Sequence, residues 1–243
     1  MQSQPSATER ATSLAWQLLN RYGVLTREAL ANENVPGAFS AIYAILKAME
    51  ESGRIRRGYF VAGLGAAQFA MPAAVDLLRS LRAAPASPQT VYLAATDPAN
   101  PYGAILRWPS DDLRPRVAAR PSGRRGPTRS AGAGVILVNG LLAAYVGKAD
   151  RQFLIFLPED EPMRGQVAGE VARALFALAT GGSDRTGMLV GEIGGVPAHQ
   201  HPLAPYLVEA GFNRRPTGFQ AAPPKTGIRS EGSAPRDGML PDR

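Results

Sequence analysis

Two groups of arginines carry the clearest chemical potential in this sequence. The first is Arg54, Arg56 and Arg57, just ahead of a glycine-containing turn. The second falls within residues 110–132, has no acidic side chain between its ends, and consists of Arg114, Arg116, Arg120, Arg124, Arg125 and Arg129. Guanidinium groups without counter-charges neutralise phosphates, and such binding weakens steeply as salt rises. Both groups predict contacts with a nucleic-acid backbone; a solvated loop without a partner is the alternative for the second.

Asp97 is the carboxylate best placed for catalysis. It ends a predicted strand in a loop rich in turn residues, and active-site side chains commonly lie in such loops. The alternative is an Asp-Pro turn in which Asp97 accepts backbone hydrogen bonds.

Three uncharged side chains are further candidates for contact with DNA. Tyr102 and Trp108 lie beside the strand that leads into the second arginine group, where they could stack on unpaired bases. Gln68 lies on the second strand of the first basic hairpin and could touch the duplex or a flipped base. Ordinary polar alternation along a strand is the alternative for Gln68.

Composition excludes several other kinds of site. The chain has no cysteine, which removes disulfides, cysteine–zinc sites and thiol nucleophiles and fits a reducing cytoplasm. Its two histidines, His199 and His201, are too few for a zinc site or a serine–histidine–aspartate triad. We therefore predict no metal and no cofactor. No apolar run approaches the roughly 20 residues of a membrane span, and no secretory signal is present, so we predict a cytoplasmic, nucleoid-associated protein without a membrane partner.

Net charge also favours a phosphate-bearing partner. The formal net charge is +7, and the basic excess lies in the first two-thirds of the chain. A basic surface attracts phosphate backbones. Arginine greatly outnumbers lysine, however, so a GC-rich genome is an alternative reason for the high isoelectric point.

The first arginine group belongs to a segment with the element order of a winged helix. Apolar residues at helical spacing predict three helices, at residues 11–22, 26–33 and 38–52. A short extended piece separates the first two. Strands at 54–60 and 67–71 then form a hairpin whose turn contains Gly63 and Gly65. We assign this winged-helix domain to residues 11–84, after a disordered tail at 1–10.

Within that domain, we expect the third helix to be the recognition helix and the hairpin to be the wing. Tyr43 and Lys47 should face outward from the helix. Alternation places Arg54 and Arg56 on one face of the wing strand and Arg57 on the other. Contacts should go mostly to the DNA backbone, because only Tyr43 and Lys47 are available to read bases. A winged helix used only for protein contact is the alternative.

The remainder predicts a second domain at residues 89–222. Asn139-Gly140 between two apolar runs is the strongest short signal for a β-hairpin with a type I′ turn. Nearly continuous apolar strands indicate burial on both faces or a closed sheet. The predicted fold class is therefore α+β: a winged-helix domain followed by a small mixed α/β domain with an antiparallel, barrel-like sheet. Residues 223–243 are rich in proline, glycine, serine and charge, and predict a disordered tail.

Several long motifs resemble one protein family in the same order. They are RYGVLTREAL, VPGAFSAIYAILKAMEESGRIRRGYFVAGLGAAQFAMP, LAATDPANPYGAILRWP, GVILVNGLLAAYV and YLVEAGFNRRPTGFQ. Across residues 11–221 the chain resembles the C-terminal region of the large helicase-related (Lhr) proteins, which are bacterial DNA-repair helicases. The resemblance implies winged helices closed by a β-barrel-like domain, similar to winged-helix DNA glycosylases. It also implies glycosylase activity on uracil-containing DNA. A glycosylase flips a base out of the duplex, and a carboxylate or a polarised water supports the positive charge that develops on the sugar. Under this implication Asp97 is the candidate carboxylate.

The chain departs from the full family because it contains no G-x-x-x-x-G-K-[ST] loop and no Walker-B-type box. We therefore expect a DNA-binding module without ATPase or helicase activity of its own, whether as a fragment, a split-gene product or a free-standing module. Its expected partners are duplex DNA or a single/double-strand junction, and a separately encoded helicase core. The alternatives are a DNA glycosylase acting on uracil or alkylated bases, and a protein-docking module for a separate helicase.

Overall fold

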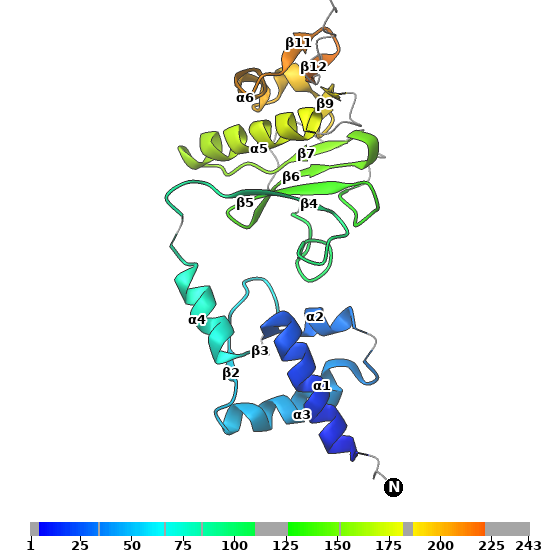
Figure 1. The fold of residues 1–243 in the computed structure, drawn as a ribbon, viewed down its shortest axis with the longest axis vertical. Helices are drawn as coiled ribbons and strands as arrows, with labels where there is room; N and C mark the ends of the chain where they lie inside the picture. Colours follow the sequence, from blue (N-terminus) through cyan, green and yellow to red (C-terminus); the bar gives the residue numbers. More distant parts are fainter. Residues whose placement is uncertain are drawn as a thin grey trace, which may run out of the picture.

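The computed structural model describes residues 5–33, 35–65, 67–83, 85–109, 126–150, 152–181 and 187–221. Figure 1 shows two lobes stacked along the long axis of the molecule. The N-terminal lobe is mainly helical, and the other is built on a four-stranded sheet. No helix in the part of the chain that the structure describes is long and apolar enough to span a membrane.

Helix α1 (Ala7–Tyr22) begins four residues earlier than predicted, inside the segment expected to be a tail. The reason is a capping box. The Glu9 backbone N–H donates to Ser6 Oγ at 3.2 Å, and the Ser6 backbone N–H donates to Glu9 Oε2 at 2.7 Å. Two of the N–H groups left free at a helix start are thus satisfied. The Ser-x-x-Glu spacing was readable in the sequence as a helix start.

The next two helices follow the predicted apolar pattern. Thr26 caps α2 (Arg27–Ala31), since its Oγ1 accepts a hydrogen bond from the Ala29 N–H at 3.1 Å. Helix α3 (Ala38–Glu51) buries a single stripe, which consists of Phe39, Ile42, Leu46 and Met49. Those residues pack with α1 and α2 into the core of the N-terminal lobe.

A small sheet completes the winged helix. Strands β1 (Val24–Leu25), β2 (Arg56–Gly58) and β3 (Gln68–Ala70) are antiparallel in the order β1-β3-β2. The central strand β3 is wholly buried, whereas β2 lies at the edge. Helix α4 (Pro72–Ser80) follows, with proline at its first position, where its fixed φ suits a helix start. Helices, edge strand and hairpin together confirm the predicted winged-helix order.

The second lobe centres on a meander of four antiparallel strands. They are β4 (Thr90–Ala94), β5 (Gly134–Val138), β6 (Leu141–Val146) and β7 (Phe153–Ile155). Asn139 and Gly140 join β5 to β6 with φ of 50° and 79°. Both values lie in the left-handed region that a type I′ turn requires, which confirms the predicted hairpin.

Both faces of this sheet are covered, which explains its nearly continuous apolar strands. Helix α5 (Met163–Thr180) packs on one face, where its Val171 and Leu175 meet Ile136 and Val146. A second apolar cluster, which includes Tyr102, Val135, Tyr145 and Leu154, covers the other face. The described pairings form one open row from β4 to β7. Antiparallel mixed α/β structure is thus confirmed, while the barrel-like shape stays a prediction.

The C-terminal part adds a hairpin that the sequence did not predict. The structure has β11 (Asn213–Arg215) and β12 (Gly218–Ala221), ordered β11-β12-β8 with β8 (Met188–Val190). The remaining elements are η2 (Lys148–Asp150), β9 (Glu192–Ile193), β10 (Val196–Pro197), η3 (Ala198–Gln200) and α6 (Ala204–Glu209).

Besides the chain connection that follows α4, the lobes meet through the loop after β4. Asn32 Nδ2 donates a hydrogen bond at 3.2 Å to the carbonyl of Ala104, which lies in the loop after β4. Ile105 of the same loop packs against the apolar core of the N-terminal lobe. The loop after β4 therefore holds the sheet lobe beside the winged helix.

Candidate nucleic-acid interface

The outer strand of the wing presents three arginines to solvent. Arg54, Arg56 and Arg57 are all exposed, and none of them forms an ion pair with another described residue. Ile55 between them is buried and anchors the strand to the core. No acidic residue occurs from position 52 to position 75. The result is a positive strand at a sheet edge, which suits contact with phosphates.

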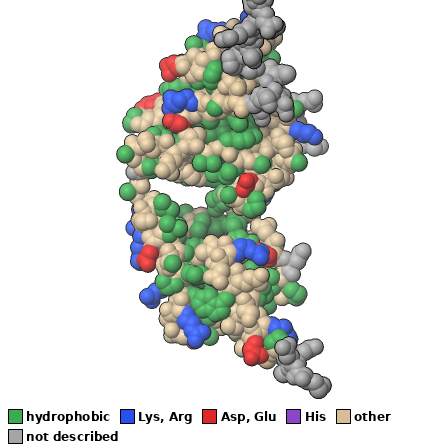
Figure 2. All heavy atoms as spheres, viewed as in Figure 1, with side chains coloured by type: hydrophobic (Ala, Val, Ile, Leu, Met, Phe, Trp, Pro, Cys, Tyr) green, Lys and Arg blue, Asp and Glu red, His purple; other side chains and the backbone are tan. Residues whose placement is uncertain are grey.

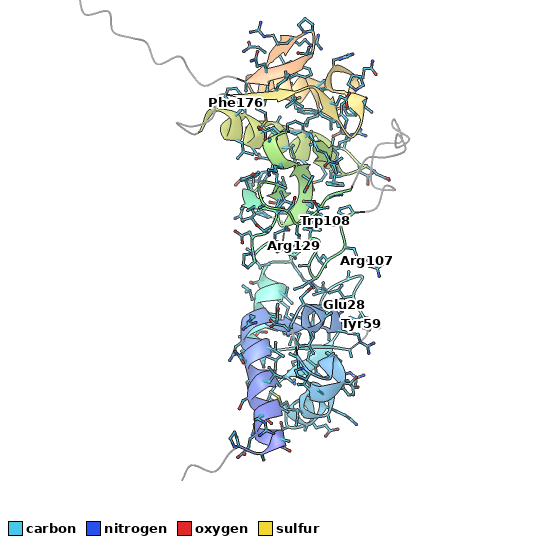
Figure 3. All side chains as sticks on the ribbon, turned by 90° about the vertical axis from the view of Figure 1, so that its right-hand side faces the viewer. Glu28, Tyr59, Arg107, Trp108, Arg129 and Phe176 are labelled. Atoms are coloured by element: carbon cyan, nitrogen blue, oxygen red, sulfur yellow. The ribbon has the colours of Figure 1, made fainter. Side chains whose placement is uncertain are left out.

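Tyr59 belongs to the same surface and was not among the residues predicted from the sequence. Its side chain is 76% exposed immediately after β2. It lies on the side of the N-terminal lobe that approaches the other lobe (Figure 3). An exposed aromatic ring beside arginines can stack on a base or a sugar. The available signal was an aromatic residue directly after the arginines and Gly58, outside the buried strand.

The outward face of α3 offers little with which to read bases. Its exposed positions are mostly small, namely Ser40, Ala41, Ala44 and Ala48. Lys47 is exposed, with its Nζ 3.6 Å from Glu51 Oε1. Tyr43 does not face outward as predicted, because its half-buried ring packs against Phe39 and Phe69 at centroid distances of 5.9 and 6.0 Å. With such small side chains, α3 can contact mainly the DNA backbone and has little to reach the edges of bases.

Gln68 is a structural residue, in contrast to its predicted contact with DNA. It is completely buried in β3. Its Oε1 accepts hydrogen bonds from the N–H groups of Phe60 and Val61, at 2.9 and 2.8 Å. Its Nε2 donates to the carbonyls of Val61 and Gly65. With every polar atom engaged, Gln68 holds the inside of the wing loop in shape.

Helix α2 holds the same loop from the other side. Glu28 Oε1 accepts a hydrogen bond from the Gly65 N–H at 3.3 Å, while Glu28 Oε2 is buried without a described partner. Burial raises the pKa of the Glu28 carboxyl, but hydrogen bonds from its own backbone, Gly65 and Thr26 together lower the pKa below its usual value. The carboxylate therefore stays charged at neutral pH and attaches the wing to α2.

Most of the second arginine group lies outside the described residues. This applies to Arg114, Arg116, Arg120, Arg124 and Arg125. Arg129 is described, and its guanidinium donates hydrogen bonds to four backbone carbonyls of the loop after β4, those of Thr96, Asp97, Asn100 and Tyr102. Its donors are used within the fold, so the prediction that Arg129 gathers phosphates does not fit its position.

The loop that Arg129 holds also engages the two aromatic candidates. Tyr102 is buried, and its hydroxyl oxygen accepts a hydrogen bond from the Leu142 N–H at 3.1 Å. Trp108 stacks on Tyr102, with ring centroids 6.4 Å apart, and meets Tyr145 edge-on. Its indole lies directly over Gly103, where a Cβ would clash. Tyr102 is thus engaged within the protein, which does not fit its predicted stacking on a base, whereas Trp108 is only half-buried and its stacking on a base stays a prediction.

Asp97 adopts the turn that was the alternative to a catalytic role. Its Oδ1 accepts a hydrogen bond from the Ala99 N–H at 2.8 Å, two residues along. Asn100 extends this arrangement, since its buried side chain donates to the Ala95 carbonyl at 2.9 Å and accepts from the Tyr102 N–H. The loop is thus rigidly built around short-range hydrogen bonds.

The histidines show no arrangement typical of a metal site. His201 is buried, and its Nδ1 accepts a hydrogen bond from the Leu203 N–H at 3.1 Å, while burial lowers its pKa to about 4. His199 is exposed. Among the described residues, no group of three or more metal-ligating side chains occurs.

Comparison with known proteins relates the chain to one group. Residues 4–90 match the model of the winged-helix domain of the large helicase-related protein. The chain is 39% identical over 229 residues to the "Lhr helicase/ probable uracil glycosylase" of Mycolicibacterium smegmatis, an alignment that covers 90% of this chain and 14% of the relative. It is 38% identical over 217 residues to the "Lhr helicase/uracil glycosylase" of Escherichia coli K12, covering 87% of this chain and 13% of that relative. The chain thus spans about one-seventh of the length of these relatives.

Proposed function

We propose, from the premise that this chain belongs to the large helicase-related (Lhr) family, that it is a DNA-binding module of an Lhr-type helicase. It engages the DNA backbone through the wing strand, at a duplex or a single/double-strand junction. It has no ATPase activity of its own. Its partner besides DNA is a helicase core, in the same or a separate polypeptide.

The observation that carries this proposal is the set of unpaired cations on the wing. Arg56 and Arg57 are exposed on the edge strand β2, and Arg54 is exposed just before it; none has an ion-pair partner among the described residues, and Tyr59 extends the same surface. Some exposed arginines elsewhere are neutralised by a nearby acid: Arg173 pairs with Glu170, and Arg164 pairs with Glu161. Leaving three cations unpaired side by side costs self-repulsion, which phosphate contact relieves.

Salt dependence tests the proposal directly. Fluorescence anisotropy of a labelled duplex and of a junction, titrated with the protein at several salt concentrations, should give a dissociation constant that rises with salt. Three phosphate contacts predict a log–log slope of roughly 3. Affinity that does not depend on salt would contradict the proposal. Weak affinity already lost at moderate salt would favour a module that docks a separate helicase.

A second candidate function, DNA glycosylase, is favoured by the names of the relatives, which include uracil glycosylase activity. Under this alternative Asp97 supports the charge on the sugar. Asp97→Asn is a suitable test because an amide oxygen can still accept from the Ala99 N–H and keep the turn. The exposed Asp76 provides the matched control, Asp76→Asn.

The measurement is alkali-labile cleavage of a uracil-containing or alkylated oligonucleotide. The glycosylase candidate predicts cleavage by the wild-type chain and by Asp76→Asn, and loss of cleavage in Asp97→Asn. DNA binding without any abasic product would leave only the binding function. Cleavage that persists in Asp97→Asn would exclude Asp97 as the catalytic carboxylate.

A further inference from the structure

A cleft of about 850 Å³ lies between the two lobes. The wing loop forms one wall, with Gly63 and Leu64, and the residues after α4 form another, with Leu81 and Arg82. The β5–β6 turn and the start of α5 close the far side. Figure 2 shows hydrophobic side chains around the hollow between the lobes. The volume falls in the range of sites that hold an organic group of moderate size.

The walls of the cleft are apolar and partly open to water. Leu141 is 70% exposed, Leu81 is 69% exposed and Met163 is 46% exposed, and all three line the cleft. Tyr102 and Phe156 are buried residues of the same lining. Large apolar side chains gathered around a cleft indicate an apolar occupant. A nucleobase, which has two apolar faces, fits such walls.

The charges that the described residues bring to the cleft are of one sign. Among those residues, the lining contains Arg82 and Arg107 and no acidic side chain. Both arginines are exposed, and neither forms an ion pair with another described residue. Figure 3 shows the Arg107 side chain reaching outward beside the junction of the lobes. An apolar interior with cations at its edge matches a base flanked by its phosphates, rather than an uncharged apolar peptide.

The wing connects this cleft with the positive strand described above. Ala62, Gly63 and Leu64 of the cleft wall belong to the hairpin that carries Arg56, Arg57 and Tyr59. Gly63 has a φ of 77°, and a Cβ placed there would meet no atom within 4 Å. The hairpin therefore leaves open space at its tip. A strand of DNA whose phosphates lie along β2 is led to the mouth of the cleft.

We infer that the cleft between the lobes binds an unpaired base of a single-stranded DNA segment, with Arg82 and Arg107 contacting the phosphates on either side. This inference rests on the proposed DNA-binding function and adds a site for the unpaired strand. The base enters the apolar space between the wing tip and Leu141, while the duplex stays on the wing. No bond is made or broken in this step.

The test compares two junction DNAs that differ only in their overhang. One overhang carries bases, and the other consists of abasic nucleotides with the same phosphates. Fluorescence anisotropy should show roughly tenfold tighter binding of the base-bearing overhang by the wild-type chain. Leu141→Asp, at an exposed position, should abolish this preference. Leu189→Asp is the matched control, because Leu189 is 46% exposed but lies on β8, outside the cleft lining.

A second measurement does not depend on any variant. A 2-aminopurine in the overhang should be shielded from acrylamide quenching when the wild-type chain binds. Equal affinity for the two overhangs, or unchanged quenching, overturns the inference while salt-sensitive duplex binding leaves the proposed function standing. Failure to bind either DNA would instead overturn the proposed function. A preference that survives in Leu141→Asp, with that variant folded, would place the base elsewhere and so also overturn the inference.

Discussion

The wing strand and the loop after β4 both depend on arginine, but they use it in opposite ways. Arg54, Arg56 and Arg57 are exposed on or just before the edge strand β2, without ion-pair partners among the described residues. Arg129 directs its guanidinium into the loop and donates to four backbone carbonyls. In the sequence both belong to basic stretches free of acids. An arginine without nearby acids is therefore not always available to a ligand, because backbone carbonyls can also accept hydrogen bonds from its guanidinium.

The largest expected effect is on DNA affinity after removal of the wing arginines. Changing Arg54, Arg56 and Arg57 together to Ala should weaken duplex binding roughly 100-fold at low salt and reduce the salt slope by about three, since three phosphate contacts are lost. Anisotropy titrations measure both quantities. Stability should stay nearly unchanged, because all three side chains are exposed.

The control for this experiment is a pair of exposed arginines on another hairpin. Arg214 lies over the Phe219 ring, and Arg215 donates to Gln220, both on the hairpin far from the wing. Changing Arg214 and Arg215 together to Ala should leave affinity within about twofold. An equal loss from both variants would mean that overall charge, and not the wing, determines binding.

Arg129→Ala should show whether Arg129 stabilises the loop after β4 or binds DNA. We expect a loss of about 2 kcal/mol in the free energy of unfolding, because carbonyls of the loop after β4 lose a charged donor. Urea denaturation measures this loss. Arg173→Ala, which breaks an exposed pair with Glu170, should cost less than about 1 kcal/mol. Reduced DNA affinity in Arg129→Ala without a loss of stability would place Arg129 with the wing arginines.

Acid should lower the free energy of unfolding through His201, which is buried in the sheet lobe. Burial lowers the pKa of His201 to about 4 in the folded chain, while in the unfolded chain it returns to its ordinary value near 6.5. Between these values the unfolded state binds more protons, so stability is complete above pH 6.5 and falls as pH drops toward 4. The expected loss is roughly 2 kcal/mol between pH 7 and pH 5.

Urea denaturation at several pH values tests this expectation. His201→Asn should flatten the pH dependence, since its amide oxygen can accept from the Leu203 N–H as Nδ1 does. The exposed His199 gives the control, and His199→Gln should leave the profile intact. A profile that is unchanged in His201→Asn would assign the acid sensitivity to other groups.

The smallest expected effect concerns the recognition helix. Lys47→Ala should weaken DNA binding by no more than about threefold, because Lys47 already lies beside Glu51 and its neighbours on α3 are mostly alanines. Anisotropy with several duplex sequences measures it. A loss that depends on base sequence would show that α3 reads bases, and the wing would then be the minor contact.

Elements with local signals were predictable from the sequence. The apolar stripe of α3 and the Asn139-Gly140 turn each depend on residues close together in the chain. The roles of Tyr102 and Arg129 were not, because their partners lie far away in the chain: Leu142 is 40 residues from Tyr102, and the carbonyls that Arg129 reaches are 27 to 33 residues away. Gln68 was missed for another reason, since its partners lie three to eight residues away but belong to an irregular loop that folds back over it. Alternation of buried and exposed side chains is expected in a strand with one face in solvent. In β3 every residue is buried, so the rule does not apply to Gln68.

The place of β2 at the sheet edge has a consequence for self-association. An edge strand offers unpaired N–H and C=O groups to any other strand, and proteins commonly guard such edges with charged side chains. Arg56 and Arg57 are those charges here, and both are exposed. Their mutual repulsion between copies keeps two wings from joining edge to edge. Under the proposed function, DNA bound along the wing would neutralise that repulsion and would itself cover the strand, so the edge would stay protected in both states.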